Sequence, residues 1–74
     1  MTMTDYIDEY GDELESIQHR LEHALECVDN AKTYLLRGLA LKASYEVFEA
    51  GTLVRGAESG LHGLHTSLDR EAKK

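Results

Sequence analysis

The stretch that decides the fold is residues 7–35, IDEYGDELESIQHRLEHALECVDNAKTYL. Its apolar residues recur in alternating steps of three and four, which places them on one side of an α-helix. They are Ile7, Tyr10, Leu14, Ile17, Leu21, Ala24, Val28, Ala31 and Leu35. The pattern lasts longer than the three or four heptads that indicate a coiled coil. It predicts a long helix over about residues 4–37 that packs against another helix.

A second heptad pattern follows, out of phase with the first. Its members are Ala40, Ala43, Val47, Ala50, Val54, Ala57, Leu61, Leu64 and Leu68. The step from Leu35 to Ala40 is five residues instead of seven, and Gly38 lies within it. A phase break beside a glycine is typical of a turn between two helices. The sequence therefore predicts a second helix over about residues 43–70, with Ser44 as a candidate cap and residues 71–74 as a frayed tail.

These patterns predict an all-α fold, a long antiparallel helical hairpin that forms a single domain over residues 1–74. The absence of proline agrees with long helices, because proline costs about 3 kcal/mol inside a helix. The alternative is a three-helix bundle with breaks near Gly38 and Gly60, since glycine also weakens helices. A hairpin of helices about 50 Å long leaves much of its apolar seam uncovered. We therefore expect the chain to dimerise into a helical bundle.

Charge is distributed unevenly along the chain, which carries a net −6. Residues 1–30 hold nine acidic residues and one basic residue, Arg20, whereas residues 31–74 carry a net +2. Such a chain repels nucleic acid and anionic membranes, so we expect neither as a direct partner. The acidic half suits a basic protein surface or a second copy of the chain.

The location is expected to be cytoplasmic. The N-terminus, Met1-Thr2-Met3-Thr4-Asp5, has neither the basic start nor the apolar run of a signal peptide. No stretch approaches the 18 or so apolar residues that a membrane span requires. Cys27 is the only cysteine, which favours a reducing compartment.

The residues that carry chemistry form no predicted catalytic, cofactor or metal site, so the chain is expected not to be an enzyme. His19 and His23 are four residues apart, a spacing that can hold a metal, but a structural zinc site needs four converging ligands. Both histidines point away from the heptad seam. Cys27 has acidic neighbours, Glu26 and Asp29, which raise the pKa of its thiol and make it a poor nucleophile.

Two sets of side chains are candidates for binding a protein. The first is an apolar set around the predicted turn, off the main seam of the second helix: Leu36, Leu39, Leu41, Tyr45 and Phe48. Helices with more than one apolar stripe bury more than one face. The second is an acidic face at the start of the first helix: Asp5, Asp8, Glu9, Asp12, Glu13 and Glu15. It suits a basic groove, or else serves as a solvated face that stabilises the helix N-terminus.

Residues 34–41, YLLRGLAL, together with Ala50 and Ala57, resemble part of one tetratricopeptide repeat in the spacing of Gly38 and the two alanines. The proline of that family is absent, and a single repeat does not fold alone. The resemblance implies helix-hairpin packing and no specific activity.

Two functions remain open from the sequence. The first is a small acidic adaptor, chaperone or regulatory protein that binds protein partners and itself. The alternative is a phage-type inhibitor of a nucleic-acid-binding machine, in which carboxylates stand where phosphates would lie, as in anti-CRISPR proteins by analogy.

Overall fold

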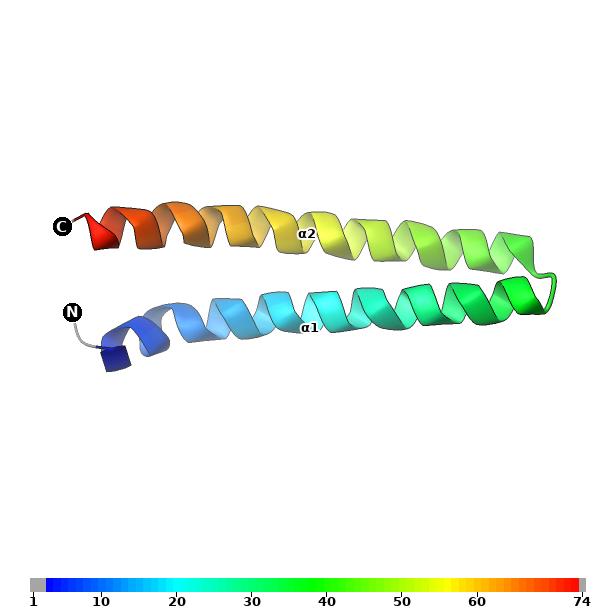
Figure 1. Ribbon diagram of the computed structural model, residues 1–74, viewed down its shortest axis with the longest axis horizontal. Coiled ribbons are helices and arrows are strands. Elements are labelled where there is room, and N and C mark those ends of the chain that lie inside the picture. The colour runs from blue at the N-terminus through cyan, green and yellow to red at the C-terminus, as the bar shows by residue number, and fades with distance from the viewer. Residues whose placement is uncertain (1–2, 74) are drawn as a thin grey trace.

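The protein folds as two long helices that pack against each other as an antiparallel hairpin (Figure 1). A computed structural model describes the backbone of residues 3–73 and the side chains of residues 9–73. Helix α1 spans Met3–Leu36 and helix α2 spans Ala40–Ala72, so the start of α1 and the end of α2 lie at the same end of the hairpin. The all-α hairpin predicted from the two heptad patterns is confirmed.

The turn consists of Arg37, Gly38 and Leu39, and its backbone forms the hydrogen bonds of a Schellman motif. The amide of Leu39 donates to the carbonyl of Tyr34 at 2.8 Å, and the amide of Gly38 donates to that of Leu35 at 3.0 Å. Gly38 has φ +73°, a left-handed conformation that glycine adopts without steric cost. Helix α2 begins at Ala40 with Leu39 as its N-cap. Ser44 therefore lies inside the helix and is not its cap, because this tight turn leads directly into α2.

Helix α2 is continuous through Gly60, so the three-helix alternative is wrong. The reason is the close approach of the two helices at this point. A Cβ atom added at Gly60 would lie 3.0 Å from Cδ1 of Ile17, on α1. Glycine here allows the helices to approach and does not interrupt α2.

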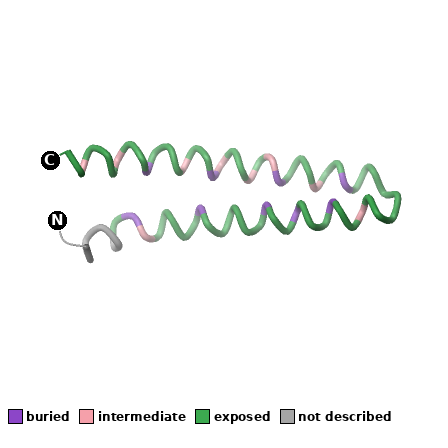
Figure 2. The backbone as a smooth tube through the Cα atoms, viewed as in Figure 1, coloured by how far each residue is buried: buried purple, intermediate pink, exposed green. Residues whose placement is uncertain are grey.

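The core consists mainly of one row of side chains from each helix, spaced seven residues apart, with Cys27 buried beside them. The buried members are Tyr10, Ile17, Ala24 and Ala31 on α1, and Ala43, Ala50, Ala57 and Leu64 on α2. We call these the contact rows. Figure 2 shows the buried positions on the side of each helix that faces the other. Five of the eight residues are alanines opposite small or apolar partners, so the helices lie close together over much of their length.

The molecule is one helix layer thick and elongated, with extents of 55 × 18 × 11 Å. Its radius of gyration is 16.8 Å, whereas a compact chain of this length has one of about 11 Å. A single layer of two helices has no interior beyond the line of contact between them. Both broad faces of the hairpin are therefore open.

Candidate protein-interaction surface

One broad face of the hairpin carries a row of large aliphatic side chains from each helix. These side chains are 38–61% exposed. They are Leu14, Leu21, Val28 and Leu35 on α1, and Val47, Val54, Leu61 and Leu68 on α2. We call this set the heptad face. It is the half of each heptad pattern that the hairpin does not bury, and all eight side chains are aliphatic.

The two rows lie on the same side of the hairpin because the helices are antiparallel. In each helix the exposed row is rotated by about 60° from the contact row. The rotation has the same hand along each helix, and the helices run in opposite directions, so both rows turn toward one face. Residues equally far from the turn lie at the same level, as Ile17 and Ala57 do in one buried cluster. Leu21 and Val54 consequently lie opposite each other near the middle of the heptad face, and we call this pair its central rung.

The solvent-accessible surface of the chain is larger than a folded monomer of its mass should have. It measures 5762 Å², whereas a compact monomer of 8.3 kDa exposes about 4,600 Å². The excess of about 1,200 Å² exceeds the roughly 800 Å² that each partner buries in a standard protein interface. The hairpin as a single chain therefore leaves uncovered an area large enough for a stable interface.

The turn cluster predicted from the sequence, Leu36, Leu39, Leu41, Tyr45 and Phe48, is exposed. Leu36 is 89% exposed and Phe48 is 70% exposed. In the heptad frame Leu36, Leu41 and Phe48 lie one position after the heptad face, on the outer edges of the hairpin. Tyr45 lies farther round α2. The structure therefore places three members of the cluster at the border of the heptad face, near the turn.

The acidic face follows the outward side of α1 near the chain ends. Glu9, Asp12, Glu13 and Glu15 are exposed, while the side chains of Asp5 and Asp8 lie outside the described residues. Nε2 of His19 is 3.8 Å from a carboxylate oxygen of Glu15. Exposed pairs of this kind contribute little to stability. These carboxylates are available to a partner, and Glu13 also lines a shallow cavity between the helices.

Cys27 belongs to the core and not to a reactive site. Its side chain is 3% exposed and lies in a buried cluster with Ala24 and Ala50, against Leu53. Burial raises the pKa of the Cys27 thiol, and a hydrogen bond to the carboxylate of Glu46 raises it further. The direction predicted from the sequence is confirmed, although the main causes are burial and Glu46 from α2.

The histidines lie on the solvent side of the helices. Nδ1 of His19 is 3.6 Å from a carboxylate oxygen of Glu22, on the same helix. Among residues 9–73, no three or more histidine, cysteine or acidic side chains converge as metal ligands would.

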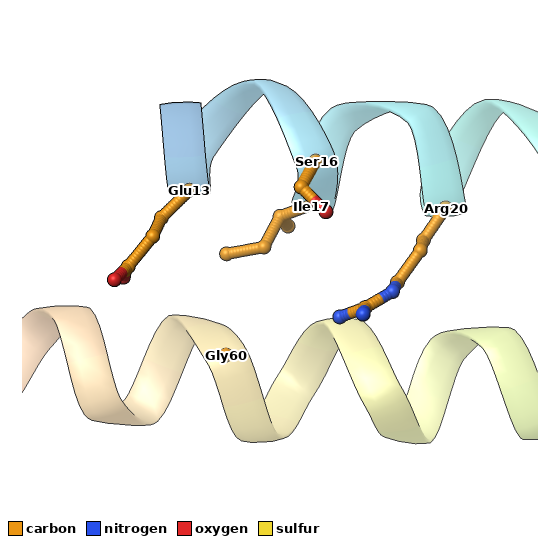
Figure 3. A pocket seen from close by; sticks show the side chains of 5 residues that line it. All are labelled: Glu13, Ser16, Ile17, Arg20 and Gly60. Carbon is orange, nitrogen blue, oxygen red and sulfur yellow. The ribbon is translucent and has the colours of Figure 1, made fainter. Parts of the chain in front are cut away.

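A shallow cavity of about 230 Å³ lies between the helices beside Gly60 (Figure 3). Glu13, Ser16, Ile17 and Arg20 line it from α1. It opens on the opposite side of the contact rows from the heptad face. Its polar lining residues, Glu13, Ser16 and Arg20, all come from α1.

Comparison with protein families, with curated proteins and with solved structures gives no match for this chain. No helix within the described residues is long and apolar enough to cross a membrane.

The heptad patterns of the sequence contain both the heptad face and the contact rows, and the spacing alone does not show which row of each helix is buried. One signal was available. The second heptad alternates between alanines (Ala43, Ala50, Ala57) and larger residues (Val47, Val54, Leu61). A row of alanines permits close helix contact, which leaves the row of larger residues to one side.

Proposed function

We propose that this protein is a non-enzymatic interaction module that works as a self-associated helical bundle. The observation that carries the proposal is the heptad face, eight aliphatic side chains left 38–61% exposed along the hairpin. Contiguous apolar patches beyond a few hundred Å² on a monomer mark interaction sites. The two longer extents of the hairpin, 55 and 18 Å, outline a face of about 1,000 Å², which exceeds the roughly 800 Å² that each partner buries in a standard interface.

A second copy of the chain is the partner that fits this face best. The face has no polar side chain among its eight members, so its partner must present an equally long aliphatic strip. The heptad face of another hairpin has that length and composition. Two hairpins stacked through these faces form a four-helix bundle whose apolar core lies between the two heptad faces. In such a bundle Glu9, Asp12 and Glu13 of the acidic face stay outside, where they are available to further partners as in an adaptor, chaperone or regulatory subunit.

The exposed carboxylates of α1 support a second candidate, an inhibitor that presents Glu9, Asp12, Glu13 and Glu15 to a basic groove. This role is compatible with a dimer, since Glu9, Asp12 and Glu13 lie away from the heptad face and its edges. It differs from the first role in its dependence on salt, because exposed charge pairs are screened and aliphatic contacts are not.

Sedimentation equilibrium at micromolar concentration tests self-association. We expect the wild-type chain to sediment as a dimer. The double variant Leu21→Gln/Val54→Gln changes the central rung of the heptad face and should shift the chain to monomer. Both residues are partly exposed within one chain and glutamine is a good helix former, so the circular dichroism spectrum should remain helical.

Tyr45→Gln is the comparison variant, because Tyr45 is exposed but lies away from the heptad face. It should leave the dimer intact. A monomeric wild type at all concentrations would contradict the proposal. Dissociation by Tyr45→Gln, with a dimer retained in Leu21→Gln/Val54→Gln, would instead locate the interface at the turn cluster.

A further inference from the structure

Two hairpins can stack through their heptad faces in two ways that obey two-fold symmetry. In the same-end arrangement, both turns lie at one end of the bundle and α1 of each copy faces α2 of the other. In the opposite-end arrangement, the turns lie at opposite ends and each helix faces its own counterpart. Neighbouring helices are antiparallel in both, so helix dipoles do not select between them. The choice depends on the side chains that border the face.

We propose that the second copy docks in the same-end arrangement, with α1 against the partner's α2. This inference rests on the proposed self-association. It follows from the sequence of side chains along the two outer edges of the hairpin, which we call the edge rows. From the turn outward, the edge row of α1 is Leu36, Asp29, Glu22 and Glu15, and that of α2 is Leu41, Phe48, Arg55 and His62. Every one of these side chains is exposed.

The two edge rows complement each other when α1 faces the partner's α2. A two-fold axis along the hairpin keeps every residue at its own level, so the rows meet in the order just given. Leu36 meets the partner's Leu41 at the turn end, apolar against apolar. Glu22 meets the partner's Arg55, acid against base, and Glu15 meets the partner's His62, whose ring N–H can donate a hydrogen bond to it. Within these four levels only Asp29, opposite the partner's Phe48, lacks a matching group. The edge row of α2 continues outward to Asp69, whose carboxylate is paired with Nζ of Lys73 in the same chain at 2.9 Å.

The opposite-end arrangement brings like against like. It places the edge row of α1 against the same row running in the opposite direction. Glu22 then lies among Glu15, Glu22 and Asp29 of the other copy, and Leu36 lies near an acid. Like charges at such an interface oppose association. The edge row of α2 would likewise place its apolar end against its polar end.

A second feature of the face agrees with the same-end arrangement. Leu25 is 66% exposed and projects from α1 beside the heptad face. Ala24 shares a buried cluster with Ala50, so Leu25 lies near the level of Gly51 on α2. A Cβ atom added at Gly51 would meet only Nη1 of Arg55 at 3.7 Å, so the helix surface is open there. In the same-end bundle Leu25 projects toward this open position on the partner, as a knob enters a hole.

Charge reversal on the edge row distinguishes the two arrangements by the sign of its effect. Glu22→Arg should weaken the dimer about tenfold or more in the same-end arrangement, since it places an arginine against Arg55 at two symmetric positions. In the opposite-end arrangement the same variant would tighten the dimer, because it relieves repulsion between acids. Combining it with Arg55→Glu should restore the wild-type dissociation constant.

Glu26→Arg is the matched control. It makes the same change in net charge four residues along the same helix, at an exposed position farther from the heptad face. It should alter the dissociation constant much less than Glu22→Arg does. Equal effects of Glu22→Arg and Glu26→Arg would show that net charge alone is responsible, and would overturn the proposed pairing.

Distance measurement between spin labels gives an independent readout. A nitroxide attached at Arg37→Cys, in a Cys27→Ala background, marks the turn of each copy. We expect an intermolecular distance below about 30 Å, since neighbouring helices are 8–10 Å apart and the labels add their own length. A single distance near 50 Å, the length of the helices, would overturn the same-end arrangement and leave self-association standing. Absence of an intermolecular distance, together with monomeric sedimentation, would overturn the proposed function itself.

Discussion

Cδ1 of Ile17 lies against the backbone of Gly60, so close that a Cβ atom on Gly60 would be 3.0 Å from it. Ile17 is 4% exposed and belongs to the same buried cluster as Ala57 and Leu64. The glycine therefore supports close packing of α1 on α2 at the expense of helix propensity. Gly63, three residues later on the same helix, has no atom within 4 Å of an added Cβ.

These two glycines give the first prediction. Gly63→Ala should stabilise the protein by about 1 kcal/mol, because alanine is favoured over glycine in a helix and space is available. Gly60→Ala gains the same propensity but forces Ile17 to move, so its net effect should be at least about 1 kcal/mol less favourable. Thermal unfolding of the two variants and the wild type at one concentration provides the measurement. Equal stabilisation by both substitutions would contradict the close approach at Gly60.

The second prediction concerns the turn. Gly38→Ala places a side chain in a left-handed conformation at φ +73°, which costs about 1–2 kcal/mol. No atom lies within 4 Å of the added Cβ, so the cost comes from the backbone and not from a clash. Gly38→Asn should lose less, because asparagine tolerates this conformation. Urea unfolding that ranks glycine, asparagine and alanine in any other order would argue against the Schellman turn.

The heptad spacing was sufficient to predict the fold, because steps of three and four have one structural interpretation and the phase break at Gly38 marks the turn. It was not sufficient to predict which apolar row faces inward. Ile17 and Leu21 are equally good core residues by composition, and only the geometry of the pair buries Ile17 and leaves Leu21 partly exposed. The effect of Gly60 was ambiguous for a similar reason. A glycine weakens an isolated helix, but it permits close contact where another helix packs against it. Which effect applies at Gly60 depends on Ile17, more than forty positions away in the sequence.

The third prediction concerns Cys27. Burial and the carboxylate of Glu46 raise the pKa of its thiol above the ordinary value of 9.0, so the thiol stays neutral and shielded in the folded protein. Alkylation of Cys27 at pH 8 should be at least about tenfold slower in the native protein than in urea, because the thiolate is the reactive form. A native rate equal to the unfolded rate would contradict its burial.

The raised pKa of the Cys27 thiol also makes the stability of the folded protein depend on pH. Because the pKa of the Cys27 thiol is higher in the folded state, its contribution to stability is complete below pH 9.0 and is lost as the pH rises through the folded value. Stability should therefore fall more steeply above pH 9 in the wild type than in Cys27→Ala. The comparison between the two proteins removes the contributions of tyrosine and lysine residues, which titrate in the same range.

The fourth prediction separates the two surfaces of α1 by their response to salt. Self-association through the heptad face depends on aliphatic contacts, so the dimer dissociation constant should change less than about tenfold between 0.1 and 1 M NaCl. The triple variant Glu9→Gln/Asp12→Asn/Glu13→Gln should leave that constant nearly unchanged, since these side chains are exposed away from the heptad face. It also removes three negative charges, which should slightly favour association between two acidic chains.

If the triple variant dissociates the dimer, the acidic face contributes to the bundle, and the division between an aliphatic interface and an acidic outer surface is wrong. If it preserves the dimer but abolishes salt-sensitive binding to a basic partner protein, the two surfaces have separate roles, with the heptad face forming the bundle and the acidic face binding the partner.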